Sequence, residues 1–207
     1  MKKFLSVLLI LTMLFAMCAC GSAAEAAYDK TGTDASAAGE SEETDPILDE
    51  LEKQGNVKTE KGVTYVYLTV PEGFAGGNAT QKDLDAKAGM AYTSATLNKD
   101  GSITYKLTTI QHRAMVDSYA ASIEKDLLSM IGDGYAFTKI VHNDNFTQFD
   151  CTVSTPTVGF TEEVAAFSFY VYGAMYGMFS GRQGETVVVN YYGPNGSLIK
   201  SSNSKDM

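Results

Sequence analysis

Residues 108–131 read TTIQHRAMVDSYAASIEKDLLSMI, a stretch that contains neither Gly nor Pro. Its apolar side chains recur at the three- and four-residue spacing of one helix face, and charged side chains occupy the opposite face. Thr108 and Gln111 have the spacing of a capping box, in which each side chain bonds to the backbone N–H of the other residue. The stretch therefore predicts an amphipathic helix about 35 Å long.

Pairs of alternating apolar segments separated by turn residues flank this helix and indicate β-hairpins. The first turn contains Asp100-Gly101, a dipeptide that favours a tight reversal of the chain. The hairpins are expected at Ala91–Leu97 with Ile103–Thr108, at Phe137–His142 with Phe146–Val153, and at Thr186–Tyr192 with Ser197–Lys200.

Four further elements complete the predicted fold. Val63–Val70 predicts a strand, and helices are expected to begin after Asp45, after Thr80 and at Thr161. Because hairpins rather than single strands alternate with helices, we predict an α+β domain. It would span residues 46–207 as a single antiparallel sheet built from hairpins, with two or three helices packed on one face.

The helix expected after Thr161 includes Val164–Gly181, which carries no charged residue and is rich in Phe and Tyr. Gly173, Gly177 and Gly181 are four residues apart. The favoured interpretation is a buried helix whose glycine stripe allows close approach to the sheet. An exposed aromatic face for a protein or glycan partner and a membrane-spanning helix are the alternatives.

The N-terminus has the features of an export signal. Lys2 and Lys3 precede the apolar stretch Phe4–Met17, and small residues surround Cys20. This segment resembles the signal peptide of bacterial lipoproteins. The resemblance implies a signal peptide over residues 1–19 and attachment of lipid, such as palmitate, to Cys20 as a membrane anchor. An ordinary cleaved signal and an uncleaved membrane helix are the alternatives.

Residues 20–45 form the predicted lipidated cysteine and a disordered acidic tether. Small and acidic residues dominate this stretch, which has too few apolar side chains to form a core. Residues 21–60 carry eleven acidic residues against three lysines, so most of the net charge of −9 belongs to this part of the chain. No basic stripe points to nucleic acid, which we exclude as a partner.

The remaining chemistry-bearing residues give little support to catalysis. Export and lipidation would leave Cys151 as a single thiol, expected to be buried and inert, and His112 and His142 are expected to be surface or turn residues. Neither a metal site nor a cofactor is predicted. The Asn143-Asp144-Asn145 turn lacks the spacing of a calcium loop, and turn chemistry explains it.

Three residues are candidate ligand contacts. Arg182 lies in a glycine-containing loop where it can meet an anion, and Tyr172 and Tyr176 belong to the aromatic helix.

Several short segments carry a second resemblance, which covers residues 63–207 and the lipidation signal. The chain resembles small predicted lipoproteins of Gram-positive anaerobes, which implies a location on the outer face of the cytoplasmic membrane but no activity, cofactor or site residue. The segments concerned are Asp100-Gly101-Ser102, Tyr105-Lys106-Leu107, Gln111-His112, Tyr172-Gly173, Tyr176 and Ser204-Lys205-Asp206-Met207.

Together these features favour a lipid-anchored, non-enzymatic domain that binds a protein or a cell-wall component outside the cell. One alternative is a cell-wall-directed hydrolase that uses a thiol, such as Cys151 with His112 or His142, or an acid/base pair. Another is a small solute-binding lipoprotein.

Overall fold

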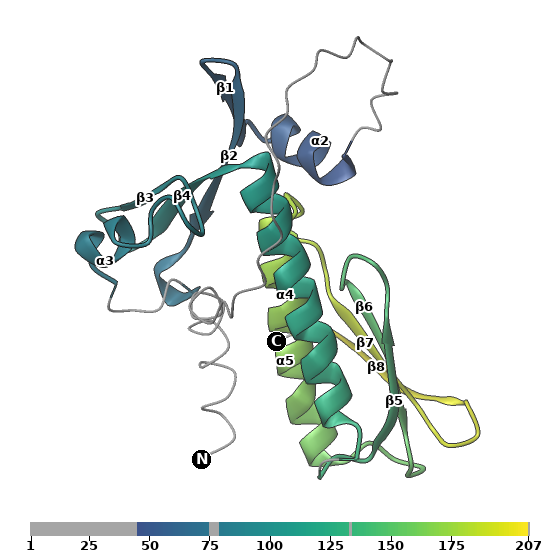
Figure 1. Cartoon of the computed structure of the whole chain (residues 1–207). Helices are drawn as coiled ribbons and strands as arrows, with labels where there is room; N and C mark the ends of the chain where they lie inside the picture. The colour runs from purple at the N-terminus through teal and green to yellow at the C-terminus, as the bar shows by residue number, and fades with distance from the viewer. Residues whose placement is uncertain (1–44, 75–78, 133, 207) are drawn as a thin grey trace, which may run out of the picture.

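Two long antiparallel helices form the centre of the structure. The computed structural model describes residues 45–74, 79–132 and 134–206, so Cys20 and the predicted signal and tether before Asp45 lie outside the described residues. Helix α4 (Thr109–Met130) and helix α5 (Phe160–Phe179) lie side by side and run in opposite directions (Figure 1). Thr108 and Gln111 make the predicted capping box at the start of α4.

The first sheet precedes α4 and is antiparallel, with strand order β1-β2-β4-β3. Strand β1 was not predicted. Lys61 and Gly62 connect it to β2 with φ values of 50° and 81°, a pair of positive angles typical of a tight hairpin turn. The elements of this part are α2 (Pro46–Lys53), β1 (Val57–Glu60), β2 (Val63–Val70), η2 (Glu72–Phe74), α3 (Gln81–Asp85), β3 (Ser94–Leu97) and β4 (Ile103–Thr108).

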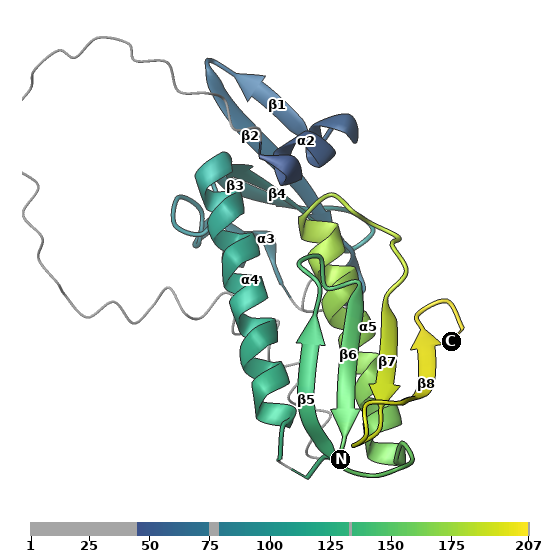
Figure 2. The ribbon, with the colours of Figure 1, turned by 90° about the vertical axis from the view of Figure 1, so that its right-hand side faces the viewer.

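The second sheet follows α4 and has the strand order β5-β6-β7-β8. Its strands β6 and β7 are parallel because α5 connects them, and its other pairs are antiparallel. Helices α4 and α5 cover one face of this sheet (Figures 1 and 2). The strands are β5 (Phe137–His142), β6 (Gln148–Val153), β7 (Val188–Tyr192) and β8 (Leu198–Asn203).

The α+β class is confirmed, but the prediction of a single antiparallel sheet with two or three helices is wrong, because the described residues form two four-stranded sheets and four α-helices. Thr108 is both the last residue of β4 and the N-cap of α4, so no loop turns the chain back towards the first sheet. The helix has 22 residues and carries the chain about 33 Å before the next hairpin begins. That hairpin therefore pairs with later strands, and a second, mixed sheet results.

Buried apolar side chains form one continuous cluster that includes both sheets and both long helices. Aromatic rings connect its layers: Phe149 stacks on Phe169 with 5.0 Å between ring centroids, and Tyr119 meets Phe179 edge-on at 5.2 Å. The predicted aromatic helix is therefore largely core, since most of α5 is buried. Phe160 and Phe167 are the exposed aromatic residues of this helix, with 81% and 54% of their surfaces accessible. Within the described residues, no helix has the combined length and apolar character needed to cross a bilayer.

Close approach at Gly173 explains how α5 fits against the second sheet. A methyl group at this position would meet the backbone carbonyl of Phe146 and would lie 2.5 Å from a methyl carbon of Val187. Gly181 has a φ of +74° and lies against Leu51 of α2, so its role differs from that of Gly173. The glycines of the predicted stripe thus serve separate contacts rather than one flat packing surface.

We expect Gly173→Ala to lower the free energy of unfolding, although Ala is the better helix former by about 1 kcal/mol. The added methyl group must displace backbone, and such overpacking costs about 1–3 kcal/mol. Chemical denaturation measures the difference. Ala174→Gly at the neighbouring exposed position is the control, which should lose about 1 kcal/mol through helix propensity alone. A Gly173→Ala protein more stable than wild type contradicts the close approach.

Candidate functional site

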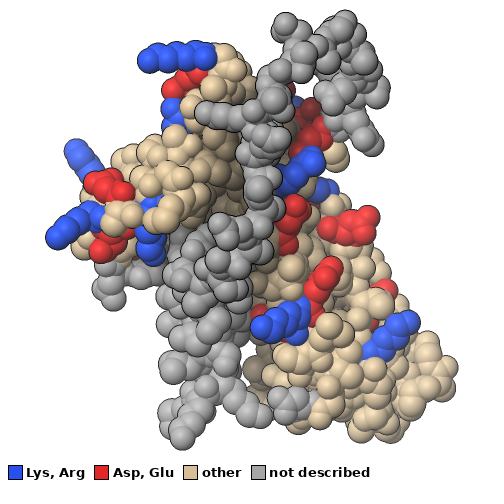
Figure 3. All heavy atoms as spheres, viewed as in Figure 1, with Lys and Arg blue, Asp and Glu red and all other residues tan. Residues whose placement is uncertain are grey.

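Acidic and basic side chains are interspersed on the face of the molecule seen in Figure 3. This face therefore has no extended field of one sign that would attract a polyanion. Among the described residues, no group of three His, Cys, Asp or Glu side chains is arranged to hold a metal ion. The better candidate for a binding site is therefore a pocket lined by charged side chains that lack an ion-pair partner.

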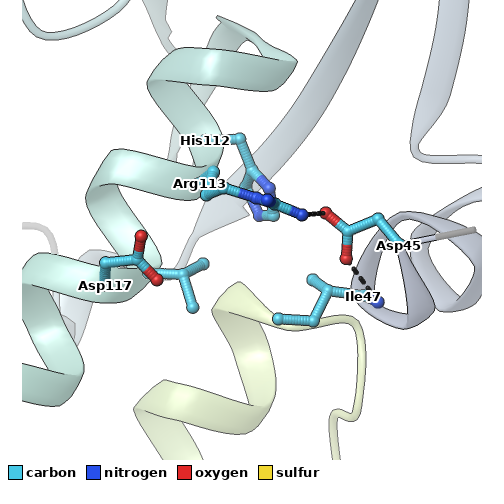
Figure 4. A pocket seen from close by; sticks show the side chains of 6 residues that line it. Asp45, Ile47, His112, Arg113 and Asp117 are labelled. Carbon is cyan, nitrogen blue, oxygen red and sulfur yellow. Dashed lines mark hydrogen bonds and ion pairs between the residues drawn. The ribbon is translucent and has the colours of Figure 1, made fainter. Parts of the chain in front are cut away.

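Such a hollow lies where the start of α2 meets the first turns of α4 (Figure 4). We call it the junction pocket. Its volume is about 190 Å³ and it opens to solvent on one side. The lining residues are Asp45, Ile47, His112, Arg113, Val116 and Asp117.

Helix α2 forms one wall of the junction pocket and is held there by three contacts. Asp45 caps the helix by accepting from the Ile47 N–H at 3.0 Å, and it pairs with Arg113 at 2.5 Å. Gln54 donates to the carbonyl of Gly181, and Leu51 is completely buried. Because an exposed ion pair contributes only about 0–1 kcal/mol whereas truncation of a buried Leu costs about 2–5 kcal/mol, Leu51 dominates the docking.

His112 lies beneath this wall and is only 2% exposed, so the prediction of a surface or turn residue is wrong. Gln111 is the N3 residue of the α4 capping box, and the next position, His112, is buried like Val116 and Tyr119. The His112 Nε2–H donates to the carbonyl of Phe179 at 2.8 Å. Burial lowers the pKa of His112, and the hydrogen bond only partly offsets this effect. His112 is therefore a neutral side chain that ties α4 to the end of α5.

The three predicted ligand residues have different environments. Tyr172 is 3% exposed, and its hydroxyl donates to Asp126 at 3.2 Å, which places it inside the helix layer. Tyr176 is 8% exposed and its ring meets that of Phe146 at 4.8 Å. Arg182 follows α5 and is half-buried. Of the three, Arg182 is the most accessible.

Neither Arg182 nor Tyr176 is among the residues that line the junction pocket, but charged side chains act on Tyr176. Burial raises the pKa of Tyr176, the Arg182 guanidinium lowers it, and the carboxylates of Asp117 and Asp144 add to the rise. Asp117 also lines the pocket. Of the two arginines of the chain, Arg113 lines the junction pocket, whereas Arg182 acts on Tyr176.

Sequence reasoning missed Asp45, Arg113 and Asp117 as pocket residues. The spacing of Arg113 and Asp117, one helical turn apart on the polar face of α4, was visible in the sequence. The sequence did not show that they line the same pocket as Asp45, because this depends on how α2 docks.

A second hollow lies between α5 and β8, but its charged groups already have partners. Glu163 pairs with Lys200 at 2.6 Å, and Tyr170 bonds to Ser202 at 2.8 Å. At the junction, by contrast, the Asp117 carboxylate makes no hydrogen bond or ion pair with the residues that the structure describes, although it lies within electrostatic range of Arg113. The junction pocket is therefore the better candidate for ligand binding.

Cys151 and the Asn143-Asp144-Asn145 turn have structural environments. Cys151 lies in β6 with none of its surface exposed, and burial raises the pKa of its thiol to about 12. Asn143 Oδ1 accepts from the N–H groups of Thr147 and Gln148, which closes the turn. His142 stacks on Phe146 at 4.3 Å.

Comparisons of this chain with protein-family models, with curated proteins and with solved structures found no match.

We expect His112 to make the stability of the fold sensitive to mild acid. Its folded pKa lies below the unfolded value of about 6.5, so its contribution is complete above that pH and is lost as the pH falls through the folded pKa. His112→Gln keeps a donor for the Phe179 carbonyl and removes the titration. Its free energy of unfolding should therefore change less than that of wild type between pH 7.5 and pH 5.5.

His142→Gln is the matched control for this measurement, because it leaves His112 in place and should retain the wild-type acid sensitivity. Equal pH dependence in wild type and His112→Gln would contradict the assignment of the effect to His112.

We expect the thiol of Cys151 to resist alkylation in the folded protein, since both burial and its high pKa disfavour the reactive thiolate. Mass spectrometry after iodoacetamide treatment should find Cys151 unmodified in buffer at pH 8 and modified in denaturant. Rapid modification of Cys151 in the folded protein would contradict its burial and would support a hydrolase that uses this thiol.

Proposed function

We propose that this protein is a lipid-anchored, non-enzymatic binding domain on the outer face of the cytoplasmic membrane. The observation that carries the anchor is the sequence Ala19-Cys20-Gly21 after an apolar segment that begins with two lysines. Acylation of Cys20 with two or more chains gives stable attachment, whereas one chain gives only marginal binding.

The junction pocket supports the binding part of the proposal. It contains a wall built by α2, a buried histidine below and charged groups at its rim. Pre-formed hollows with a few placed polar groups are the usual form of small-ligand sites. Its volume lies below the ~300 Å³ typical of pockets for drug-sized ligands, so a small ligand fits best.

Binding is favoured over thiol hydrolysis by the environments of the residues that such an enzyme would use. Cys151 is completely buried, and His112 is bonded to the Phe179 carbonyl. A nucleophile must reach its substrate as a thiolate and must have a base within hydrogen-bond reach. Cys151 does not meet the first requirement, because its thiol is buried and its pKa is raised.

Cys20→Ala should move the protein from the membrane fraction to the soluble fraction, or leave it unprocessed, because the acceptor for lipid is gone. The measurement is fractionation of cells that express the full chain, combined with incorporation of an alkyne-labelled palmitate. Cys18→Ala is the matched control and should stay labelled and membrane-bound. Unchanged membrane retention and labelling of Cys20→Ala would refute the lipid anchor.

A further inference from the structure

Strand β8 forms one edge of the second sheet, and within the described residues no further strand lies beyond it (Figure 2). Its pairing with β7 is regular from Lys200 to Asn203. In the same register, the backbone N–H of Ser204 donates to the carbonyl of Val187 at 2.9 Å. Because backbone groups of an antiparallel strand alternate between its two sides, those of Ser201 and Asn203 point away from β7.

This outer edge of β8 is open to a further strand. The Asn203 carbonyl accepts from the Asp206 N–H at 3.2 Å, but the Ser201 N–H and C=O and the Asn203 N–H bond to nothing in the described part of the chain. Such groups are a template for the backbone of another extended chain. A lysine often blocks an edge of this kind, but Lys200 pairs with Glu163 of α5 at 2.6 Å instead.

The second hollow lies next to this edge, between β8 and α5, and has a volume of about 250 Å³. Its two charged residues, Glu163 and Lys200, neutralise each other, so an uncharged side chain suits the hollow. Phe167 forms an aromatic wall with 54% of its surface accessible, and Ala166 adds to the apolar lining. Exposed apolar surface at a concave site is typical of a place where a partner inserts an apolar group.

Side chains of β8 alternate between the two faces of the sheet. Lys200 and Ser202 direct theirs towards α5, where both make hydrogen bonds. Ser201 directs its hydroxyl to the opposite face, where it donates to Asn190 at 2.8 Å. A chain paired with β8 has the same alternation. Its residues opposite Lys200 and Ser202 therefore face the second hollow, and the residue between them faces polar side chains.

We propose that β8 binds an extended peptide of a partner protein as an additional strand, with alternate apolar side chains of that peptide at the second hollow. In this mode of recognition, backbone hydrogen bonds give affinity and pockets for alternate side chains give specificity. A peptide fits better than a sugar because its backbone matches the open N–H and C=O groups of Ser201. The proposal goes beyond the proposed function, since it adds a protein-binding surface that does not depend on the junction pocket.

The test is fluorescence anisotropy of the full chain in detergent micelles with three labelled hexapeptides. The first has the alternating sequence Thr-Phe-Thr-Phe-Thr-Lys. The second is the same peptide with a methyl group on the backbone nitrogen of the central Thr, which blocks strand pairing and keeps every side chain. The third is Phe-Phe-Thr-Thr-Thr-Lys, which has the same composition without the alternation. The second and third should bind about tenfold or more weakly than the first. Equal affinity for all three, or no binding of the first, overturns the proposal.

Amide hydrogen exchange locates the bound peptide on the protein. With the alternating peptide at ten times its dissociation constant, about a tenth of the protein is free, so the Ser201 N–H should exchange about tenfold more slowly. Strand β1, an edge strand of the first sheet, is the internal control and should exchange at an unchanged rate. Unchanged exchange at Ser201 while the peptide is bound overturns the proposal.

Two pairs of variants assign the contacts. Ser201→Pro removes the outward N–H at a position where an edge strand tolerates proline, and it should bind about tenfold or more weakly. Ser201→Ala keeps this N–H and should bind like wild type. Phe167→Ala should also lose about tenfold or more in affinity. Phe160→Ala, on the same helix but outside the second hollow, should bind like wild type.

Wild-type affinity in Phe167→Ala overturns the proposal, as does wild-type affinity in Ser201→Pro. Circular dichroism shows whether Ser201→Pro is folded, and the two Phe variants decide the outcome if it is not.

A second copy of this chain is the other occupant that an open edge can take. Sedimentation of the full chain in micelles distinguishes it. A wild-type dimer that becomes monomeric in Ser201→Pro and does not bind the alternating peptide assigns β8 to self-association and overturns the proposal. Thermal stabilisation by a small ligand without peptide binding also overturns it, but leaves the proposed binding function standing. The membrane anchor is tested independently by Cys20→Ala.

Discussion

The buried hydrogen bond from His112 to the Phe179 carbonyl ties the first turn of α4 to the last turn of α5. A carbonyl at the end of a helix has no partner within the helix, and leaving it buried and unpaired costs about 1–3 kcal/mol. His112 provides that partner and is itself almost fully buried. The two long helices are thereby fixed side by side at the point where α2 docks, and the junction pocket forms above this contact.

The helix pair also explains why one continuous core includes two separate sheets. Helix α4 begins without a loop at the end of the first sheet, and α5 returns along it while covering the second sheet. Loops on both sides of α5 let β7 lie parallel to β6, an arrangement that requires a crossover connection. Helix α4 follows β4 without a loop, so it places the hairpins before and after it in different sheets.

Local chemistry was readable from the sequence wherever it depended on neighbouring residues. The capping box of Thr108 and Gln111, the hairpin at Asp100-Gly101 and the strand Val63–Val70 all lie where their patterns predict. Strand β1 escaped notice because its four residues are half-buried or exposed and lack an apolar pattern. Which sheet a strand joins depends on the direction in which the preceding element carries the chain. Local sequence patterns do not predict that direction.

The site was less predictable than the fold for the same physical reason. Arg182 was chosen for its loop, and in the structure its charge acts on Tyr176, although Arg182 does not line the junction pocket. Tyr172 has the same residue type as Tyr176 and lies one helical turn away, yet its hydroxyl is bonded to Asp126 within the helix layer. Asp45 belongs by composition to the acidic tether, and only the docking of α2 makes it a wall of the pocket. These residues differ in their burial and in their hydrogen-bond and ion-pair partners. Both properties depend on contacts between residues that are distant in sequence.

Asp45 joins the proposed tether to the proposed ligand site. It caps α2, and its carboxylate holds Arg113 at the pocket wall, so burial, which raises its pKa, is outweighed by the hydrogen bond from Arg113 and the pKa lies below its usual range. The described part of the chain therefore begins at the wall of the junction pocket. A ligand whose affinity depends on docked α2 must stabilise that docking by the same factor, because coupling between two equilibria is reciprocal. The residue at which the chain enters the described domain is thus also a wall of the junction pocket, and the buried Leu51 lies against Gly181 where α2 docks.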